Sequence, residues 1–271
     1  TAPVSLFVRP VSDIAMPTEF SRGPWDPGAL HGGPVAALLA HVVENVAVDG
    51  IDWFVARMTV ELERPVTMEP LQLHAEITRP GRKVSIVEAS ITRAETGAVL
   101  ARARALRIRT ADVPLPSGDP ELGPLLAIER PPPGPDHGHA ADLGPNDDIA
   151  FHNGGAEHRF LGDRASPLGP VVDWIRLRVP LFPDVALTPL QRVAGAVDFA
   201  NGISHVLPWE THLFVNPDLT IHQFRPLRGE WVGMASATLH GTRGVGMSDT
   251  AVFDVDGRIG RSCQSLLLDA R

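Results

Sequence analysis

The chain has 271 residues, 44% of them hydrophobic, and a formal net charge of −8 at pH 7. This length and composition predict a globular protein with one large domain or two of ordinary size. The negative charge argues against nucleic acid or an anionic membrane as the main partner, because both bind basic surfaces. No apolar run approaches the roughly 18 residues of a membrane span. Cys263 is the only cysteine, so the chain has no internal disulfide, and a cytoplasmic location is expected.

The first predicted element is a helix that begins near Pro34, with Gly33 as its cap. Its apolar residues recur at helical spacing and form a wide stripe: Val35, Leu38, Leu39, Val42, Val43 and Val46. Alternating apolar and polar residues then predict strands at residues 58–63, 71–77, 84–91 and 98–109. Turn signals separate these strands, so this part of the chain predicts one helix followed by an antiparallel sheet, an α+β arrangement.

A proline-rich segment divides the chain in two. Its composition cannot sustain the hydrogen bonds of a sheet, so it predicts a linker. We therefore expect an N-terminal domain at residues 1–110, a linker at 111–148 and a C-terminal domain at 149–271.

The C-terminal domain contains a second helix with a clear start. Thr188 is a capping residue, Pro189 suits the first helical position, and Gln191 completes a capping box. The helix is expected to run to about Asn201. Strands are predicted at residues 158–161, 172–179, 213–215, 219–224, 231–238, 249–253 and 259–268.

The second half repeats the first at an offset of 160 or 161 residues. Shared landmarks are Arg64–Pro65 with Arg225–Pro226, and Gly97 with Gly257. At this offset Asp198 falls opposite Ala37, and Gln264 falls opposite Arg104. A carboxylate beside the apolar stripe of a helix is costly unless its oxygens are satisfied, either by neighbouring backbone or by a functional site. An Asp and a Gln confined to the same copy favour a functional site in that copy.

Five segments carry a resemblance to a known family. They are Gly32–Gly33, Val197–Phe199, Asn216–His222 with Arg225–Pro226, Gly229–Trp231 and Cys263–Ser265. Together they resemble the double-hotdog acyl-CoA thioesterases of the type II, thioesterase-like superfamily, in its actinobacterial branch. The resemblance implies a tandem hotdog fold, with two antiparallel sheets each wrapped around a long central helix and joined side by side.

The resemblance also implies hydrolysis of fatty acyl-CoA thioesters, without a metal or cofactor. In the related enzymes an Asp, a Ser or Thr, and a Gln activate water; Asp198 and Gln264 match the first and last. The hydroxyl position is a departure: Asn216 stands there, and Thr220 follows four residues later. A helix start at Gly32–Gly33, preceded by His31, is the candidate site for the oxyanion. A homodimer or higher oligomer is expected.

Two other functions compete with this interpretation. A protein that binds acyl-CoA or an acyl carrier without catalysis would be consistent with Asn216 in place of the hydroxyl. A hydratase would need an Asp and a His at a spacing that neither His205 nor His222 has from Asp198. The His152–Gly155 run is like a hydrolase signature of single-hotdog enzymes, but a strand-like segment follows it, so a loop is expected there.

Overall fold

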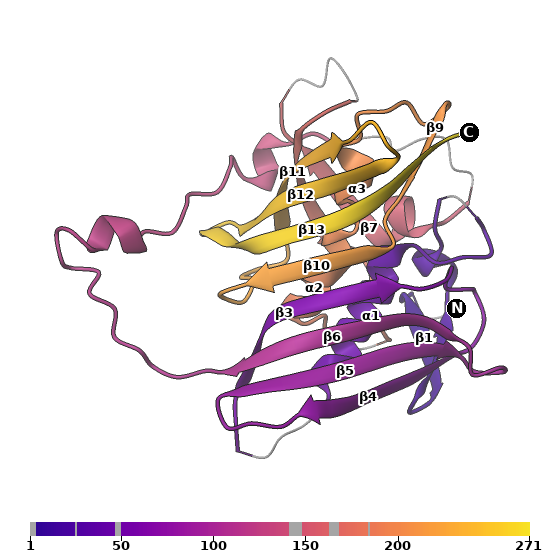
Figure 1. Ribbon diagram of the computed structural model, residues 1–271, viewed down its shortest axis with the longest axis horizontal. Helices are drawn as coiled ribbons and strands as arrows, with labels where there is room; N and C mark the ends of the chain where they lie inside the picture. Colours follow the sequence, from indigo (N-terminus) through magenta and orange to yellow (C-terminus); the bar gives the residue numbers. More distant parts are fainter. Residues whose placement is uncertain (1–3, 25, 47–49, 141–147, 163–167, 184) are drawn as a thin grey trace.

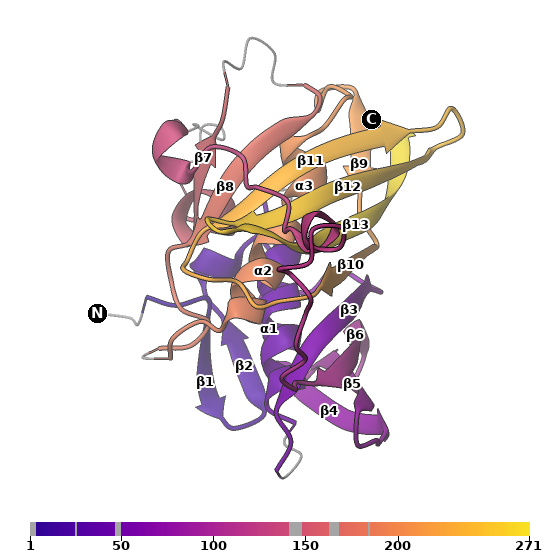
Figure 2. The ribbon, with the colours of Figure 1, turned by 90° about the vertical axis from the view of Figure 1, so that its left-hand side faces the viewer.

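Two copies of one folding pattern meet along a single pair of strands in this protein. The computed structural model describes residues 4–24, 26–46, 50–140, 148–162, 168–183 and 185–271. The strands form one antiparallel sheet of 13, with the main helices on one face (Figures 1 and 2). Their order is β1-β2-β4-β5-β6-β3-β10-β13-β12-β11-β8-β7, and β9 pairs with β13. The two sheets that the resemblance implies, joined side by side, form one continuous sheet.

The N-terminal copy places its helix before its four long strands. Its elements are β1 (Phe7–Val11), β2 (Ile14–Pro17), a 3-10 turn η1 (Glu19–Ser21), α1 (Gly32–Glu44), β3 (Trp53–Leu62), β4 (Leu71–Arg79), β5 (Val84–Arg93) and β6 (Val99–Arg109). The short strands β1 and β2 were absent from the sequence prediction, since Pro10 and Pro17 interrupt their pattern.

The C-terminal copy follows the linker, which holds two 3-10 turns, η2 (Gly123–Leu126) and η3 (Pro135–His137). Its elements are a π-helical turn η4 (Phe151–Gly155), β7 (Ala156–Phe160), β8 (Val171–Leu177), α2 (Pro189–Val197), α3 (Ala200–Ile203), β9 (His212–Val215), β10 (Asp218–Gln223), β11 (Val232–His240), β12 (Val245–Asp254) and β13 (Gly257–Ala270). The linker lies against this copy, where the indole Nε1 of Trp174 donates to the Pro133 carbonyl at 2.7 Å.

The seam between the copies is the antiparallel pair β3–β10. Thr59 lies opposite Thr220, its own counterpart at the 161 offset, and the two hydroxyls are 3.1 Å apart. A residue that pairs with its own duplicate marks a pseudo-two-fold axis, the relation that two identical subunits would have. The seam therefore joins the copies as a symmetric dimer would be joined.

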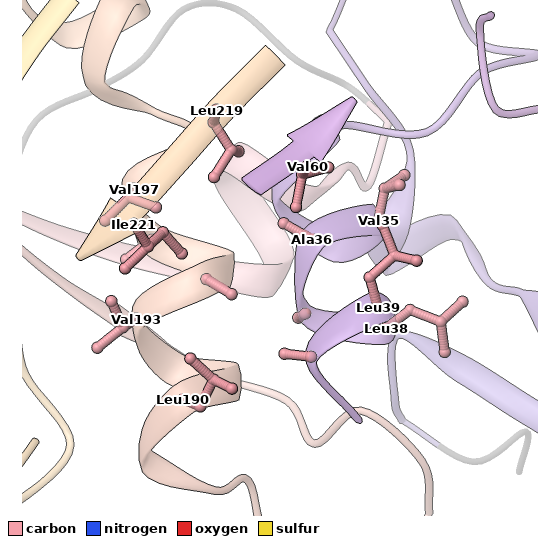
Figure 3. Close-up of a cluster of buried hydrophobic side chains, with 14 of the residues drawn as sticks. Val35, Ala36, Leu38, Leu39, Val60, Leu190, Val193, Val197, Leu219 and Ile221 are labelled. Carbon is pink, nitrogen blue, oxygen red and sulfur yellow. The ribbon is translucent and has the colours of Figure 1, made fainter. Parts of the chain in front are cut away.

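Buried residues beside the seam connect the sheet to both helices (Figure 3). On the strands, Val60 and Leu219 alternate with Thr59 and Thr220, so the apolar side chains point toward the helices. The facing residues are fully or almost fully buried: Val35, Leu38 and Leu39 on α1, and Leu190, Val193 and Val197 on α2. Each such side chain contributes about 1.5–3 kcal/mol by leaving water. The apolar stripe predicted for the first helix is confirmed as far as Val43, whereas Val46 lies beyond the end of α1.

The ends of the helices differ from the prediction in two places. The first helix begins at Gly32, close to its predicted start, but its cap is His31 and not Gly33. The second helix begins as predicted, with the Thr188–Gln191 capping box, but it stops at Val197 and resumes as α3. The predicted single helix to Asn201 was therefore wrong.

Two features are absent from the described residues. None of their helices is long and apolar enough to cross a membrane. Likewise, these residues contain no cluster of three or more His, Cys, Asp or Glu side chains arranged to hold a metal ion.

Candidate active site

The break between α2 and α3 places Asp198 in the interior, at 5% exposure. The buried side chain of Gln264, which is 1% exposed, stabilises this break. Its Nε2 donates to the Asp198 carbonyl at 3.2 Å, and its Oε1 accepts from the Asn201 N–H at 3.1 Å. These are backbone groups that an unbroken helix would satisfy itself, so the glutamine replaces the missing helical bonds.

Three donors surround the Asp198 carboxylate. His31 Nδ1 lies 2.9 Å from Oδ2, and Asn216 Nδ2 donates to Oδ1 at 2.9 Å. The Gly33 N–H is also hydrogen-bonded to the carboxylate. The Gly33 nitrogen lies 3.1 Å from His31 Nδ1 as well, but a ring nitrogen that faces a carboxylate carries the proton and cannot accept. A carboxylate accepts about four hydrogen bonds, so three donors leave room for one water.

The charge of Asp198 is set by a balance of opposing effects. Burial alone would raise its pKa, but hydrogen bonds from His31, Asn216 and the Gly33 amide outweigh it and hold the pKa below its usual value. Asp198 is therefore ionised at neutral pH although it is buried.

Two glycines allow the close approach of α1 to this carboxylate. A Cβ on Gly32 would lie 2.6 and 2.7 Å from the Asp198 carboxylate oxygens. A Cβ on Gly33 would overlap the carbonyl oxygen of Gly195. Any larger residue at either position would push the start of α1 away from Asp198.

The carboxylate opens into a pocket of about 990 Å³. One wall comes from the loop before α1 and from the end of β3, including Leu62 and Arg64. The other comes from the C-terminal copy and is largely aromatic and aliphatic: Phe160, Leu168, Phe199, Ile203, Trp209 and Phe214. His31, Asp198 and Asn216 lie among the lining residues. A pocket of this size, in which apolar walls surround a group of polar side chains, is typical of a small-molecule site.

Aromatic rings support the His31 side chain from the C-terminal copy. Phe199 lies 4.5 Å from the His31 ring and 4.6 Å from the His158 ring, and it stacks on Phe151 at 5.3 Å. His152, in the same π-helical turn as Phe151, lines the pocket. Burial, with the nearby charges of His31 and His158, lowers the pKa of His152 to about 4, so its ring is neutral at pH 7.

The predicted site residues separate into two groups. Asp198, Asn216, His31, Gly32 and Gly33 are brought together, with Gln264 behind them on the backbone. Thr220 lies apart, because Asn216 and Pro217 belong to the connection before β10 and the strand alternation assumed between 216 and 220 does not hold. The His152–Gly155 run, expected to be a loop, is a π-helical turn at the pocket, and only its own His–Asn–Gly–Gly pattern could have indicated this. His205 lines the pocket, whereas His222 is exposed.

The strand register corrects one predicted equivalence. Thr59 pairs with Arg104 just as Thr220 pairs with Cys263, so the counterpart of Arg104 is Cys263. Gln264 therefore corresponds to Ala105, which is fully buried. Arg104 points to the other face, where it forms an exposed ion pair with Glu88. The asymmetry between the copies remains, with an apolar residue opposite the glutamine.

Comparison with known proteins identifies the class. Residues 21–108 match the family model of the acyl-CoA thioesterase N-terminal domain, and residues 129–268 match that of the C-terminal domain. The chain therefore belongs to the acyl-CoA thioesterase family, a family of thioester hydrolases. No curated protein matches this sequence.

Solved structures share the fold. A protein assigned as a thioesterase from Novosphingobium aromaticivorans DSM 12444 is 19% identical, with a TM-score of 0.71 over 97% of this chain and 98% of its own. A hotdog-fold protein of unknown function from Alicyclobacillus acidocaldarius is 12% identical, with a TM-score of 0.69 over 95% and 93%. An acyl-CoA thioesterase II from Mycobacterium marinum is 15% identical, with a TM-score of 0.62 over 98% and 96%. At these identities the likeness shows the fold.

Proposed function

We propose that this protein hydrolyses fatty acyl-CoA thioesters with a water molecule activated by Asp198. The observation that carries the proposal is a buried, ionised carboxylate that lines the large pocket beside the first turn of α1. A buried carboxylate with one free acceptor position is suited to hold a water and accept its proton.

The chemistry follows from this geometry. Asp198 takes a proton from water as the water oxygen bonds to the thioester carbonyl carbon. The carbonyl oxygen becomes an oxyanion, which the amides and dipole at the start of α1 stabilise near Gly32. The tetrahedral intermediate then expels the thiolate, and the proton held by Asp198 neutralises it. The products are the free acid and CoA.

Three neighbours act on this base without reacting themselves. His31 and Asn216 fix the orientation of the carboxylate, and Asn216 is held in turn by Asn201 Nδ2, which donates to its Oδ1 at 3.4 Å. The amide of Asn216 thus takes the position that a hydroxyl fills in related enzymes. Gln264 positions Asp198 through its backbone.

The pocket walls suggest how the substrate is oriented. The aromatic and aliphatic wall of the C-terminal copy suits the acyl chain. Arg64, exposed at the opposite wall, has no acid within ion-pair distance among the described residues, so it suits the phosphates of CoA.

Thiol release from acyl-CoAs of increasing chain length tests the function. A hydrolase gives turnover with a maximum at the chain length that fills the pocket. Binding of acyl-CoA without thiol release would instead establish the non-catalytic alternative. The oligomer and the cytoplasmic location stay predictions, and sedimentation of the purified protein tests the first.

A further inference from the structure

A second, smaller cavity lies at the opposite end of the two helices. Its volume is about 310 Å³, and its walls come from the end of α1, the start of α2, β3, β6 and β10. Because α1 and α2 run antiparallel, this end of the helix pair contains the C-terminus of α1 and the N-terminus of α2. Glu44 on α1 accepts hydrogen bonds there from Thr188 and Gln191 at the start of α2.

This cavity is the internal duplicate of the catalytic pocket. Seven of its nine lining residues have a counterpart, 161 positions away, that lines the catalytic pocket. The pairs include Val55 with Asn216, Trp53 with Phe214 and Glu44 with His205. The pseudo-two-fold axis through Thr59 and Thr220 relates the two cavities, so both descend from one pocket shape.

The hydrolytic groups are missing from the duplicate. Ala37 stands at the position of Asp198, and Val55 at that of Asn216. Pro189 begins α2 and removes one of the amide N–H groups that a helix start would offer to an oxyanion. A ligand in this cavity would therefore be bound without being hydrolysed.

Arg107 gives the cavity a charge of its own. Its side chain lines the cavity and is 3% exposed, and no acid within the described residues lies within ion-pair distance. The guanidinium donates to the Val46 carbonyl at 2.7 Å and lies 5.4 Å above the Trp53 ring. Two further donors, Arg107 Nε and Trp53 Nε1, are buried without a hydrogen-bond partner. A buried cation and two unmet donors are costly unless an anion balances them.

Glu44 is the other titratable group at this cavity. Its Oε2 accepts from the Thr188 hydroxyl at 2.8 Å and from Gln191 Nε2 at 3.0 Å, so its charge is met by the start of α2. Burial raises the pKa of Glu44 above its usual value, against the opposing effect of these two hydrogen bonds. Arg107 also donates to the Ser85 hydroxyl at 3.3 Å, but its partners are neutral and no acid among the described residues pairs with it. The remaining walls are mainly apolar: Trp53, Phe54, Val55, Leu190 and Pro226.

We propose that this duplicate cavity binds the carboxylate of an aliphatic acid, with the carboxylate facing Arg107 and the chain against Trp53. Acids of this kind are also what a thioesterase releases, so the cavity would hold a product-like ligand at a place distinct from the hydrolytic site. Such binding would not depend on Asp198 acting as a base.

Tryptophan fluorescence separates the two cavities, because Trp53 lines the duplicate and Trp209 lines the catalytic pocket. The probe is 8-bromooctanoate, whose bromine quenches an indole that it touches. In Trp209→Phe we expect saturable quenching from Trp53. Adding Arg107→Gln should weaken this quenching at least tenfold, whereas adding Arg107→Lys, which keeps the charge, should largely preserve it. The neutral 8-bromooctanol should quench at least tenfold more weakly.

Each result decides the proposal. Circular dichroism establishes that the variants fold. If Arg107→Gln unfolds, the acid and the alcohol are compared in Arg107→Lys instead. Equal quenching by acid and alcohol, or quenching unchanged by Arg107→Gln, would overturn the role of the charge. Quenching seen in Trp53→Phe but not in Trp209→Phe would mean that the acid binds the catalytic pocket alone, and would also overturn the proposal.

Discussion

The N- and C-terminal copies share a fold, a helix position and a sheet register, but only one of the two cavities between them contains the proposed base, Asp198. That cavity takes Asp198 and Asn216 from the C-terminal copy and His31 and Gly32 from the N-terminal copy. The opposite cavity has Ala37 in place of the acid. The comparison teaches that the helix and sheet specify a pocket, whereas a few substitutions at equivalent positions specify its chemistry.

The duplicated arginines show the same divergence. Arg225 forms two hydrogen bonds to Asp254, at 2.5 and 2.7 Å, and Asp254 is fully buried. Its counterpart Arg64 has lost such a partner and stands exposed at the catalytic pocket. One copy therefore uses the arginine to fix a turn, and the other leaves it accessible to a ligand.

The largest effect is expected at the position that most distinguishes the copies. Asp198→Asn keeps the shape of the side chain but removes its basicity, so kcat should fall by about 10²–10⁴-fold, the usual contribution of a general base. Thiol release measures the loss, and circular dichroism controls for folding. Turnover within tenfold of wild type would exclude Asp198 as the base.

Breaking the Arg225–Asp254 pair should cost stability in the C-terminal copy. Asp254→Ala leaves a largely buried guanidinium unpaired, and about 3–5 kcal/mol of unfolding free energy should be lost. Hydrogen bonds from Arg225 lower the pKa of Asp254 in the folded protein, against the opposing effect of burial. The pair therefore stabilises the fold fully at pH values above the carboxyl pKa of the unfolded chain, and this stabilisation is lost as pH falls through the pKa of the folded protein. Urea unfolding at several pH values measures the loss of stability and its pH dependence. The control is Glu63→Gln, which breaks an exposed ion pair with Arg102 and should cost about 1 kcal/mol or less.

The contact between α1 and α2 is sensitive to a single methyl group. Gly33→Ala places a Cβ against the Gly195 carbonyl and should cost about 1–3 kcal/mol as the helices separate. Gly202→Ala is the matched control, since a Cβ there meets no atom within 4 Å and should cost nothing measurable. Thermal unfolding distinguishes them. Equal midpoints would contradict the close packing.

The N-terminal copy contributes to the base through His31. His31→Gln removes a charge-assisted hydrogen bond, so kcat should fall on the order of 10-fold. The same change removes a cause that lowers the pKa of Asp198, so the acidic limb of the kcat/KM profile should move to higher pH. An unmoved limb with reduced kcat would assign His31 a different task, outside the orientation of Asp198.

The smallest effect is expected at the pocket entrance. Arg64→Gln should raise KM for acyl-CoA a few-fold and leave kcat nearly unchanged, because it removes binding common to the ground and transition states. A thioester of N-acetylcysteamine, which lacks the phosphates, should show no change in KM. Arg243→Gln, remote from the pocket, provides the control. A KM that rises equally for both substrates would contradict phosphate recognition by Arg64.

The sequence was sufficient for the parts of the fold and site that depend on local patterns. The helix stripes and the Thr188 capping box follow from spacing along the chain, and comparing the copies singled out Asp198. The contact of His31 with Asp198 could not be predicted, because 167 residues separate them and no periodicity links them. The break after Val197 depends on Gln264 in a distant strand, so helix propensity alone extended α2 too far. Thr220 was misplaced because Pro217 interrupts the alternation.

The seam between β3 and β10 has a consequence for how the active site assembles. As separate polypeptides, the halves would associate only above a concentration set by their affinity. They could also form like pairs, in which no aspartate meets a histidine. The covalent connection makes assembly unimolecular, so every molecule brings unlike halves together and contains one pocket with both Asp198 and His31 at any dilution.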